Sequence, residues 1–427
     1  MMMTTPVTVQ RCERCGNEQA EASSAVECPI CGGLLELLHR VEEDAATLRA
    51  RFDERLAHSL APDGAAPTRS GVWRYRELIL PVARDADIVT HPEGNTPLLR
   101  RASVATWAGV DALFLKHEGH NPTGSFKDRG MTVAVTQARR LGAPAVACAS
   151  TGNTSASLAS YASHAGIPAL VVVPKGKVAL GKLAQTLAYG ARTLVIDGDF
   201  DDCLQLVRAA GEALGVYLVN SVNPFRIEGQ KAIALELLQQ LGWEPPDWIV
   251  VPAGNLGNTA AIGKALVEAR KIGLIARVPR VAAVQAAGAA PFAQAFATGF
   301  RRRASVRAET VASAIRIGDP ASWDRAVRTM RETDGVAIAV SDDEILEAKA
   351  AIDGSGVGCE PGSAAAVAGV RSLVRQGLVR PGDHVVAILT GHILKDPEIL
   401  VQAGGNRPVE IEGTLSEVAR VLNYNGE

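Results

Sequence analysis

The 427-residue sequence lacks the features that would point to a membrane or a nucleic acid. It has no run of about 18 apolar residues, so no transmembrane helix is expected. Its first residues, Met1–Pro6, lack a basic region followed by an apolar core, so no signal peptide is expected. Its net charge of −2 gives no electrostatic reason to expect a nucleic acid or an anionic membrane as partner. The composition, 47% hydrophobic and 21% charged, is that of a soluble globular chain with room for two or three domains.

Cysteine is scarce, and its pattern argues against a disulfide framework. The seven cysteines are an odd number, and four of them form two close pairs, Cys12-x2-Cys15 and Cys28-x2-Cys31. Each pair can present two thiolates to one tetrahedral ion, so the spacing favours a structural Zn²⁺ over two redox pairs. Such a pattern is typical of a zinc ribbon. The segment has no lysine between Gln10 and Leu38, which disfavours nucleic acid as its ligand. The thiol cluster also indicates a reducing compartment, the cytoplasm.

The rest of the chain alternates short apolar runs with helical patterns, which predicts parallel β-sheet covered by helices on both faces. An amphipathic helix is expected at Val41–Ala61, followed by a linker at Pro62–Ser70. The expected strands are Ala145–Ala149, Ala169–Val173, Arg192–Ile196, Val216–Val219, Trp248–Val251, Val281–Val284 and His384–Leu389. The expected helices include Ser155–His164, Ala179–Tyr189, Phe200–Leu214 and Glu228–Leu241. We therefore expect an α/β protein whose functional residues lie in loops at the carboxyl ends of the strands.

One stretch, KHEGHNPTGSFKDRG at residues 116–130, carries the strongest signal for chemistry. A strand end at Ala112–Leu115 leads into a turn at Pro122–Gly124, and Ser125 is expected to cap the helix that follows. Lys127 then lies in the first helical turn, where unpaired backbone N–H groups disfavour an ammonium ion. A lysine held neutral can attack a carbonyl and form a Schiff base. From these residues alone, an ordinary surface lysine is an equally good interpretation.

Three further loops follow predicted strands. STGNT at residues 150–154 could bind a carboxylate at a helix start, or could simply cap that helix. NSVNPFR at residues 220–226 could clamp a phosphate through its arginine, or could be an Asn-Pro turn beside a surface arginine. PAGNLGNT at residues 252–259 brings glycines to a helix start, where backbone N–H groups could hold a phosphate. It is neither a dinucleotide fingerprint nor a Walker A motif, so nucleotide binding is disfavoured.

The lysine stretch resembles the Schiff-base motif of the fold-type II pyridoxal-phosphate enzymes, and NPTGSFKDR at residues 121–129 is similar to the threonine synthases among them. The similarity extends from about Val72 to Pro397. It implies two parallel-sheet α/β domains beside the zinc-ribbon-like segment, pyridoxal 5′-phosphate as cofactor, and a homodimer. The expected boundaries are 1–40 for the ribbon, 136–221 for the small domain, and 41–135 with 222–427 for the large catalytic domain.

The resemblance also assigns roles to the residues of these motifs. Lys127 would be the Schiff-base lysine and the catalytic base. The other cofactor ligands would be Asn153 at the ring hydroxyl, Thr390 at the pyridine nitrogen, and a phosphate loop of Gly254, Asn255, Leu256, Gly257 and Asn258. The substrate carboxylate would be held by Ser150, Thr151, Gly152 and Thr154. The substrate phosphate would be held by Lys116, Asn220, Ser221 and Arg226. The metal ligands would be Cys12, Cys15, Cys28 and Cys31.

These roles imply conversion of O-phospho-L-homoserine and water to L-threonine and phosphate, the last step of threonine biosynthesis. Two alternatives stay open. A threonine or serine dehydratase shares the lysine and the phosphate loop, but it has no reason to keep a second phosphate site at residues 220–226 with Lys116. A non-catalytic homologue could act as a binding protein, although the intact set of Lys127, Asn153 and Thr390 argues against it.

Overall fold

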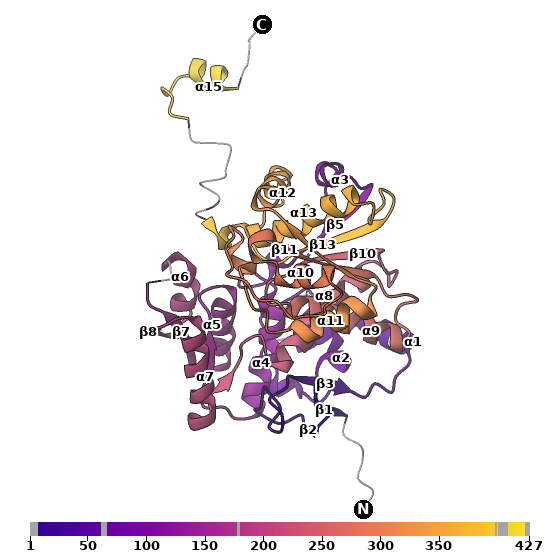
Figure 1. Ribbon diagram of the computed structural model, residues 1–427, viewed down its shortest axis with the longest axis vertical. Helices are drawn as coiled ribbons and strands as arrows, with labels where there is room; N and C mark the ends of the chain where they lie inside the picture. The colour runs from indigo at the N-terminus through magenta and orange to yellow at the C-terminus, as the bar shows by residue number, and fades with distance from the viewer. Residues whose placement is uncertain (1–6, 61–65, 177–179, 398, 400–408, 423–427) are drawn as a thin grey trace, which may run out of the picture.

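The computed structural model describes residues 7–60, 66–176, 180–397, 399 and 409–422, and it contains three β-sheets (Figure 1). Part of the expected linker at Pro62–Ser70 and the expected helix ends at Ala61 and Ala179 lie outside these residues. Within the described residues, no helix combines the length and apolar character needed to cross a membrane. The sheets are a small antiparallel one near the N-terminus and two larger ones with parallel strands.

The N-terminal sheet has the strand order β2-β1-β3, with β1 at Thr8–Cys12, β2 at Glu18–Ala20 and β3 at Leu35–His39. It lies at the bottom of the molecule in Figure 1, against the large α/β body. Polar contacts hold it there: Glu13 forms an ion pair with Arg325 at 2.9 Å, and a ring nitrogen of His39 lies 3.0 Å from Glu228, within hydrogen-bond distance. The ribbon is therefore part of the packed body.

The largest sheet has the order β12-β11-β10-β13-β5-β4. Its strands are parallel except β4, which runs antiparallel to β5. Side chains of β10 alternate between two cores, because Ile249 and Val251 belong to one and Trp248 and Val250 to the other. Burial on both faces explains why these strands are continuous apolar runs. The strands are β4 Leu98–Arg100, β5 Ala112–His117, β10 Trp248–Pro252, β11 Arg280–Ala286, β12 Val336–Val340 and β13 His384–Leu389.

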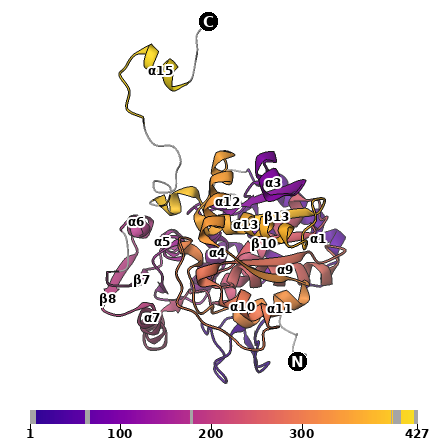
Figure 2. The same cartoon turned by 45° about the horizontal axis from the view of Figure 1, so that its top comes forward.

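Helices cover both faces of this sheet (Figure 2). One face packs against α3 Ala102–Ala108, α12 Asp342–Gly354 and α13 Pro361–Arg375. The other packs against α4 Lys127–Arg140, α8 Pro224–Gln240, α9 Gly257–Ile272 and α11 Trp323–Glu332. The remaining α-helices of this part are α1 Ala45–Ala57, α2 Arg76–Ile79 and α10 Pro291–Ala297, and α15 Leu415–Val421 stands apart from the body in both views.

The third sheet is parallel, with the order β8-β7-β6-β9, and forms the lobe at the left of Figure 1. Its strands are β6 Val146–Ala149, β7 Ala169–Pro174, β8 Arg192–Ile196 and β9 Tyr217–Leu218. Its helices are α5 Asn153–Ala165, α6 Leu180–Ala188 and α7 Phe200–Leu214. The edge strand β8 has largely exposed side chains, so coverage on both faces does not extend to it.

The prediction of parallel α/β sheet is confirmed, with some differences in detail. The sequence analysis gave no strand at β12, and it did not foresee the antiparallel edge strand β4. The first helix is shorter than the expected Val41–Ala61, because Asp44 caps it through the backbone N–H groups of Ala46 and Thr47. The expected domain boundary at residue 135 falls inside α4.

Candidate active site

Lys127 is the first residue of α4, and the pKa of its amine is close to neutral pH. Burial is the main cause that lowers the pKa of Lys127 from 10.5 to about 7. The Arg226 guanidinium lowers it further, while the Glu360 carboxyl acts in the opposite direction. A large fraction of the amine is therefore uncharged at neutral pH, as a nucleophile or proton acceptor requires. The structure adds burial and a nearby cation to the helix start that the sequence indicated.

The turn before α4 differs from the predicted one. Phe126, not Ser125, is the N-cap residue, and no side chain caps the helix. Asp128 braces the turn instead, accepting hydrogen bonds from Thr123 N at 2.7 Å and Thr123 Oγ1 at 2.6 Å. It also accepts one from Ser157 Oγ on α5 at 2.6 Å. Ser125 Oγ is buried and makes no hydrogen bond within the described part of the chain, so it is left for a ligand.

Lys116, expected at the substrate phosphate, lies in a buried ionic cluster. Its side chain is fully buried, and its ammonium donates to Thr96 O at 2.8 Å, Glu236 Oε1 at 2.6 Å and Gln240 Oε1 at 2.8 Å. An ammonium has only three N–H donors, so none remains for a phosphate. Arg129 completes this ionic cluster through Glu236 at 2.8 Å, and thereby anchors the start of α4.

The loop after β6 opens α5 as expected, and all five of its residues 150–154 are partly exposed. Ser150 Oγ accepts a hydrogen bond from Gly152 N at 3.3 Å, which shapes the loop. Asn153 Nδ2 donates to Glu360 Oε2 at 3.0 Å. Glu360 Oε1 lies 3.1 Å from Thr390 Oγ1 at the end of β13. The structure thus brings Asn153 and Thr390 to the same carboxyl, although they come from different sheets.

Residues 220 and 221 connect loops of the two larger sheets. Asn220 donates from Nδ2 to Ala149 O at 3.0 Å and accepts at Oδ1 from Ala149 N at 3.1 Å, so it extends the small sheet to the Ser150 loop. Ser221 Oγ accepts from Asn255 Nδ2 at 2.5 Å. This second bond joins the end of the small sheet to the loop after β10.

Arg226 is a buried cation with unused donors. It is 1% exposed, and its Nη1 donates to Val219 O at 3.0 Å. Its Nε and Nη2 have no hydrogen-bond partner among the described residues, and no described carboxylate pairs with it. Burial lowers the pKa of Arg226 to about 10, so it remains charged at neutral pH. A buried guanidinium of this kind is complete only with an anion, which it can bind in a fork.

The loop after β10 offers backbone N–H groups at a helix start. Leu256 adopts φ 63° as the N-cap of α9, and the first N–H groups of the helix have no intrahelical partner. A Cβ at Gly254 would lie 2.9 Å from Ile315 Cα, so the loop passes too tightly for a side chain. Four buried side chains beside the helix start have polar atoms without partners in the described residues: Asn258, Thr259, Gln230 and Ser322. Such atoms are normally hydrogen-bonded, so together they call for a polar ligand.

These residues fit pyridoxal phosphate. A helix start with free N–H groups suits its phosphate, a near-neutral lysine suits its aldehyde, and Asn153 and Thr390 offer donors for a ring between them. The sequence analysis missed Ser125, Gln230, Thr259, Ser322 and Glu360 as side chains of the site. Glu360 directly precedes the helix α13, and a helix start is the kind of position that the other site loops share, so its position could have been found. The others are ordinary polar residues of helices and turns, and only their unsatisfied burial reveals them.

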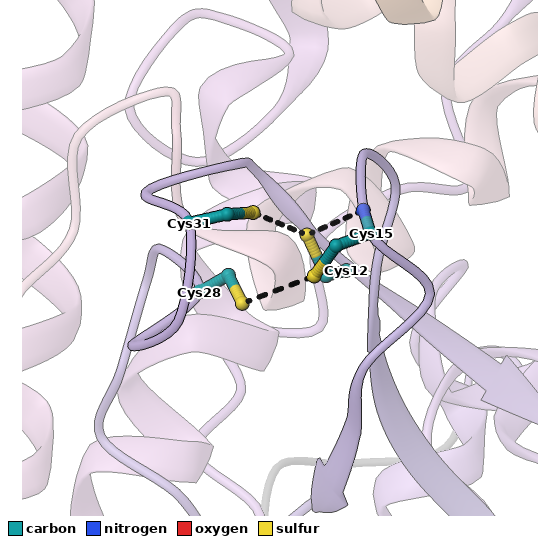
Figure 3. Close-up of side chains that lie close together, drawn as sticks. All are labelled: Cys12, Cys15, Cys28 and Cys31. Atoms are coloured by element: carbon teal, nitrogen blue, oxygen red, sulfur yellow. Dashed lines mark hydrogen bonds between the residues drawn. The ribbon is translucent and has the colours of Figure 1, made fainter.

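The four cysteines of the ribbon also converge (Figure 3). Their sulfur atoms all lie within 4.8 Å of one another, with Cys12 and Cys31 3.5 Å apart and Cys15 and Cys28 3.7 Å apart. A tetrahedral zinc with bonds of about 2.3 Å would separate its sulfur ligands by about 3.8 Å. The two turns are alike, because Gly16 N bonds Cys12 O and Gly32 N bonds Cys28 O. This geometry is compatible with a metal ion.

Comparisons with known proteins agree with this site. Residues 89–391 match the pyridoxal-phosphate dependent enzyme family. The threonine synthase of Methanocaldococcus jannaschii is 42% identical, over 97% of this chain and 99% of its own length. That of Methanosarcina acetivorans is 44% identical, over 96% of this chain and 98% of its own length.

Solved structures show the same fold. The threonine synthase of Escherichia coli matches with a TM-score of 0.70 at 21% identity, covering 96% of this chain and 94% of that one. A threonine deaminase of Solanum lycopersicum matches with a TM-score of 0.63 at 19% identity, covering 84% of this chain and 94% of that one. At these identities the structures speak for the fold alone. With the identity to its relatives extending over nearly its whole length, the chain belongs to the threonine synthases, a family of pyridoxal-phosphate-dependent lyases.

Proposed function

We propose that this chain converts O-phospho-L-homoserine and water to L-threonine and phosphate. The observation that carries the proposal is Arg226, a fully buried guanidinium with two unused donors and no carboxylate partner in the described chain. It lies within electrostatic reach of Lys127, and as a side-chain cation on α8 it differs in kind from the backbone loop at Gly254–Asn258. Two anion sites beside one lysine suit a cofactor phosphate and a substrate phosphate. A dehydratase substrate has no use for the second.

The two phosphates differ in what binds them. Gly254, Asn255, Leu256, Gly257 and Asn258 hold the cofactor phosphate, with the hydroxyls of Thr259 and Ser322 as further donors to its oxygens. Asn153 and Thr390 orient the ring from opposite sheets. Arg226 holds the substrate phosphate, aided by Ser221, whose hydroxyl already contacts the loop through Asn255. Asn220 supports the loop of Ser150, Thr151, Gly152 and Thr154, which holds the substrate carboxylate through hydroxyls and a helix start.

Pyridoxal phosphate, when bound, withdraws electrons from the substrate and so makes its carbon-bound protons removable. Lys127 is the group that moves those protons. Its amine, near neutral, removes the proton from Cα and then transfers protons at Cβ and Cγ. Arg226 stabilises the phosphate as it leaves Cγ. Water then adds its oxygen at Cβ, and Lys127 returns a proton to Cα.

The same proposal includes the rest of the chain. Cys12, Cys15, Cys28 and Cys31 bind one structural Zn²⁺, supported by their close sulfur atoms. Residues 1–40 form the ribbon domain, 41–135 and 222–427 the large domain, and 136–221 the small domain. The protein acts as a homodimer in the cytoplasm. None of the seven cysteines, all of them among the described residues, forms a disulfide, which suits a reducing compartment.

One assay tests the reaction. Purified protein with pyridoxal phosphate is given O-phospho-L-homoserine, and inorganic phosphate and L-threonine are both measured. Parallel reactions with L-threonine and L-serine measure ammonia and oxo acid release. Phosphate and threonine should appear in equal amounts, with only a small side reaction on the other substrates. Dehydratase activity without phosphate release from O-phospho-L-homoserine would overturn the proposal.

A further inference from the structure

Glu360 is a buried carboxyl that connects the two sides of the site. It is 2% exposed and immediately precedes α13. One of its oxygens lies 3.0 Å from Asn153 Nδ2, on the small-sheet helix α5, and the other lies 3.1 Å from Thr390 Oγ1, at the end of β13. These are the two donors proposed above for the cofactor ring. The role inferred here for Glu360 rests on that proposed cofactor site.

The backbone makes room for this carboxyl. A Cβ at Gly391 would lie 2.4 Å from Glu360 Cδ, so any side chain there would displace it. Glu360 N also donates to Gly391 O at 3.1 Å, which fixes the two segments against each other. The position of the carboxyl is therefore built into the fold.

The hydroxyl of Thr390 has only one proton to give. Ser363 Oγ accepts from Gly391 N at 2.9 Å and lies 2.9 Å from Thr390 Oγ1, so Ser363 is set to donate to Thr390. If Glu360 is ionised, Thr390 must donate its one proton to that carboxylate, and none is left for a ligand. If Glu360 carries a proton, it donates to Thr390 instead, and the Thr390 hydroxyl is free to donate into the site.

The surroundings favour the protonated carboxyl. Burial is the largest cause that raises the pKa of Glu360, and Asp396 raises it further. The hydrogen bonds from Asn153 and Thr390 and the charge of Lys395 act in the other direction. Glu360 also raises the pKa of Lys127 on α4 through its charge, but no described residue forms an ion pair with Glu360. Without a paired cation, a buried carboxyl avoids its charge by keeping its proton.

We propose that Glu360 is a positioning residue that holds a proton and donates it in a hydrogen bond to Thr390, so that the Thr390 hydroxyl points its own proton at the pyridine nitrogen of the cofactor. Asn153 completes the arrangement by donating to the other oxygen of Glu360 while its second N–H remains available to the ring hydroxyl. Glu360 itself touches neither substrate nor reacting atoms.

The test compares the wild-type protein with Glu360→Gln, whose amide donates to Thr390 and accepts from Asn153 at every pH. The probe is pyridoxine 5′-phosphate, which has an alcohol in place of the aldehyde and cannot bond to Lys127. Its dissociation constant is measured from about pH 5.5 to about pH 9.5, a range that extends roughly one unit beyond the neutral range on each side. The wild-type constant, divided by that of the variant, should be level at low pH. Above the pKa of Glu360 it should rise about tenfold per pH unit, because only the wild type loses a proton that binding needs.

A second readout uses no cofactor at all. Folding raises the pKa of the Glu360 carboxyl above its ordinary value of 4.5, so the protonated carboxyl stabilises the fold at low pH. This contribution to the free energy of unfolding falls as pH rises from 4.5 through the pKa of the folded state, and the loss is complete above that pKa. The melting temperature of Glu360→Gln should therefore rise relative to that of the wild type over that pH range.

A double variant tests the link to Thr390. Thr390→Val should abolish the pH-dependent difference in probe binding between Glu and Gln at position 360, since the two residues act through each other.

The outcomes separate two failures. If the wild type does not bind pyridoxine 5′-phosphate at any pH, the cofactor site itself is wrong, and the role of Glu360 is lost with it. If the wild type binds but the ratio to Glu360→Gln stays level across the range, Glu360 does not act through its proton. The same conclusion follows if the difference persists unchanged in the Thr390→Val background.

Discussion

Replacing Arg226 by alanine tests the substrate-phosphate site most directly. Its Nε and Nη2 are the unused donors, and a hydrogen bond to a charged group contributes about 1.5–3 kcal/mol. Loss of this contact should lower kcat/KM for O-phospho-L-homoserine by roughly ten- to 150-fold. Inhibition by inorganic phosphate should weaken as well. Cofactor content should remain near that of the wild type, because the cofactor phosphate is assigned to the loop at Gly254–Asn258.

Two controls keep this result interpretable. The substitution leaves Val219 O without its partner, at a cost of about 1–3 kcal/mol, but it also removes a buried unpaired charge, which offsets that cost. The fold should therefore survive, as circular dichroism can check. Arg226→Lys keeps the charge without the fork and should be intermediate. The side reaction on L-threonine, which has no phosphate, should change little. Equal slowing on both substrates, or loss of the cofactor, would refute the assignment.

Three other variants test the remaining assignments. Lys127→Ala should lose turnover even where cofactor still binds, and more than a few per cent of the wild-type kcat would exclude Lys127 as the proton carrier. In the wild type, kcat should rise with pH through an apparent pKa of about 7, since the Lys127 amine is free once the substrate has replaced it on the cofactor and its neutral form is the active one; a pH-independent kcat would contradict that origin. Cys28→Ser should lose a zinc ion that copurifies at one per chain and should lower stability with kcat nearly intact; metal analysis that finds no zinc would reject the site. Lys116→Met should destabilise the fold by about 3 kcal/mol in denaturant unfolding, because it breaks a buried pair with Glu236. If it instead impaired only the phosphorylated substrate, Lys116 would return to the site.

The sequence predicted the parallel sheets, the start of α4 and the loops of the site because those features depend on local patterns. Continuous apolar runs indicate strands buried on both faces, and a Gly/Asn loop after such a strand indicates a helix start with free N–H groups. Lys127, Asn153, Arg226 and Thr390 each follow a strand or open a helix, so the alternation of elements was enough to gather them.

Long-range contacts were beyond this reasoning. The Lys116 side chain, near the end of β5, contacts Glu236 rather than the site at Lys127. Only the packing of α8, whose Glu236 lies 120 residues further along the chain, decides that contact. Ser125 was expected as a cap by its residue type, but Asp128 braces the turn through Thr123 and leaves the serine unused. The importance of Glu360 depends on two partners 207 and 30 residues away. No periodicity records such pairs.

The ribbon has a consequence for how the chain is made. The residues that contact it are synthesised much later, since Arg325 follows its partner Glu13 by 312 residues and Glu228 follows its partner His39 by 189 residues. At about 5–20 residues per second, Glu13 leaves the ribosome's active centre roughly 15–60 s before Arg325 is added. With the proposed Zn²⁺ held by its four cysteines, the segment would need neither partner in order to fold. The ribbon can therefore wait as a finished surface, on which α8 and then α11 settle as each is synthesised.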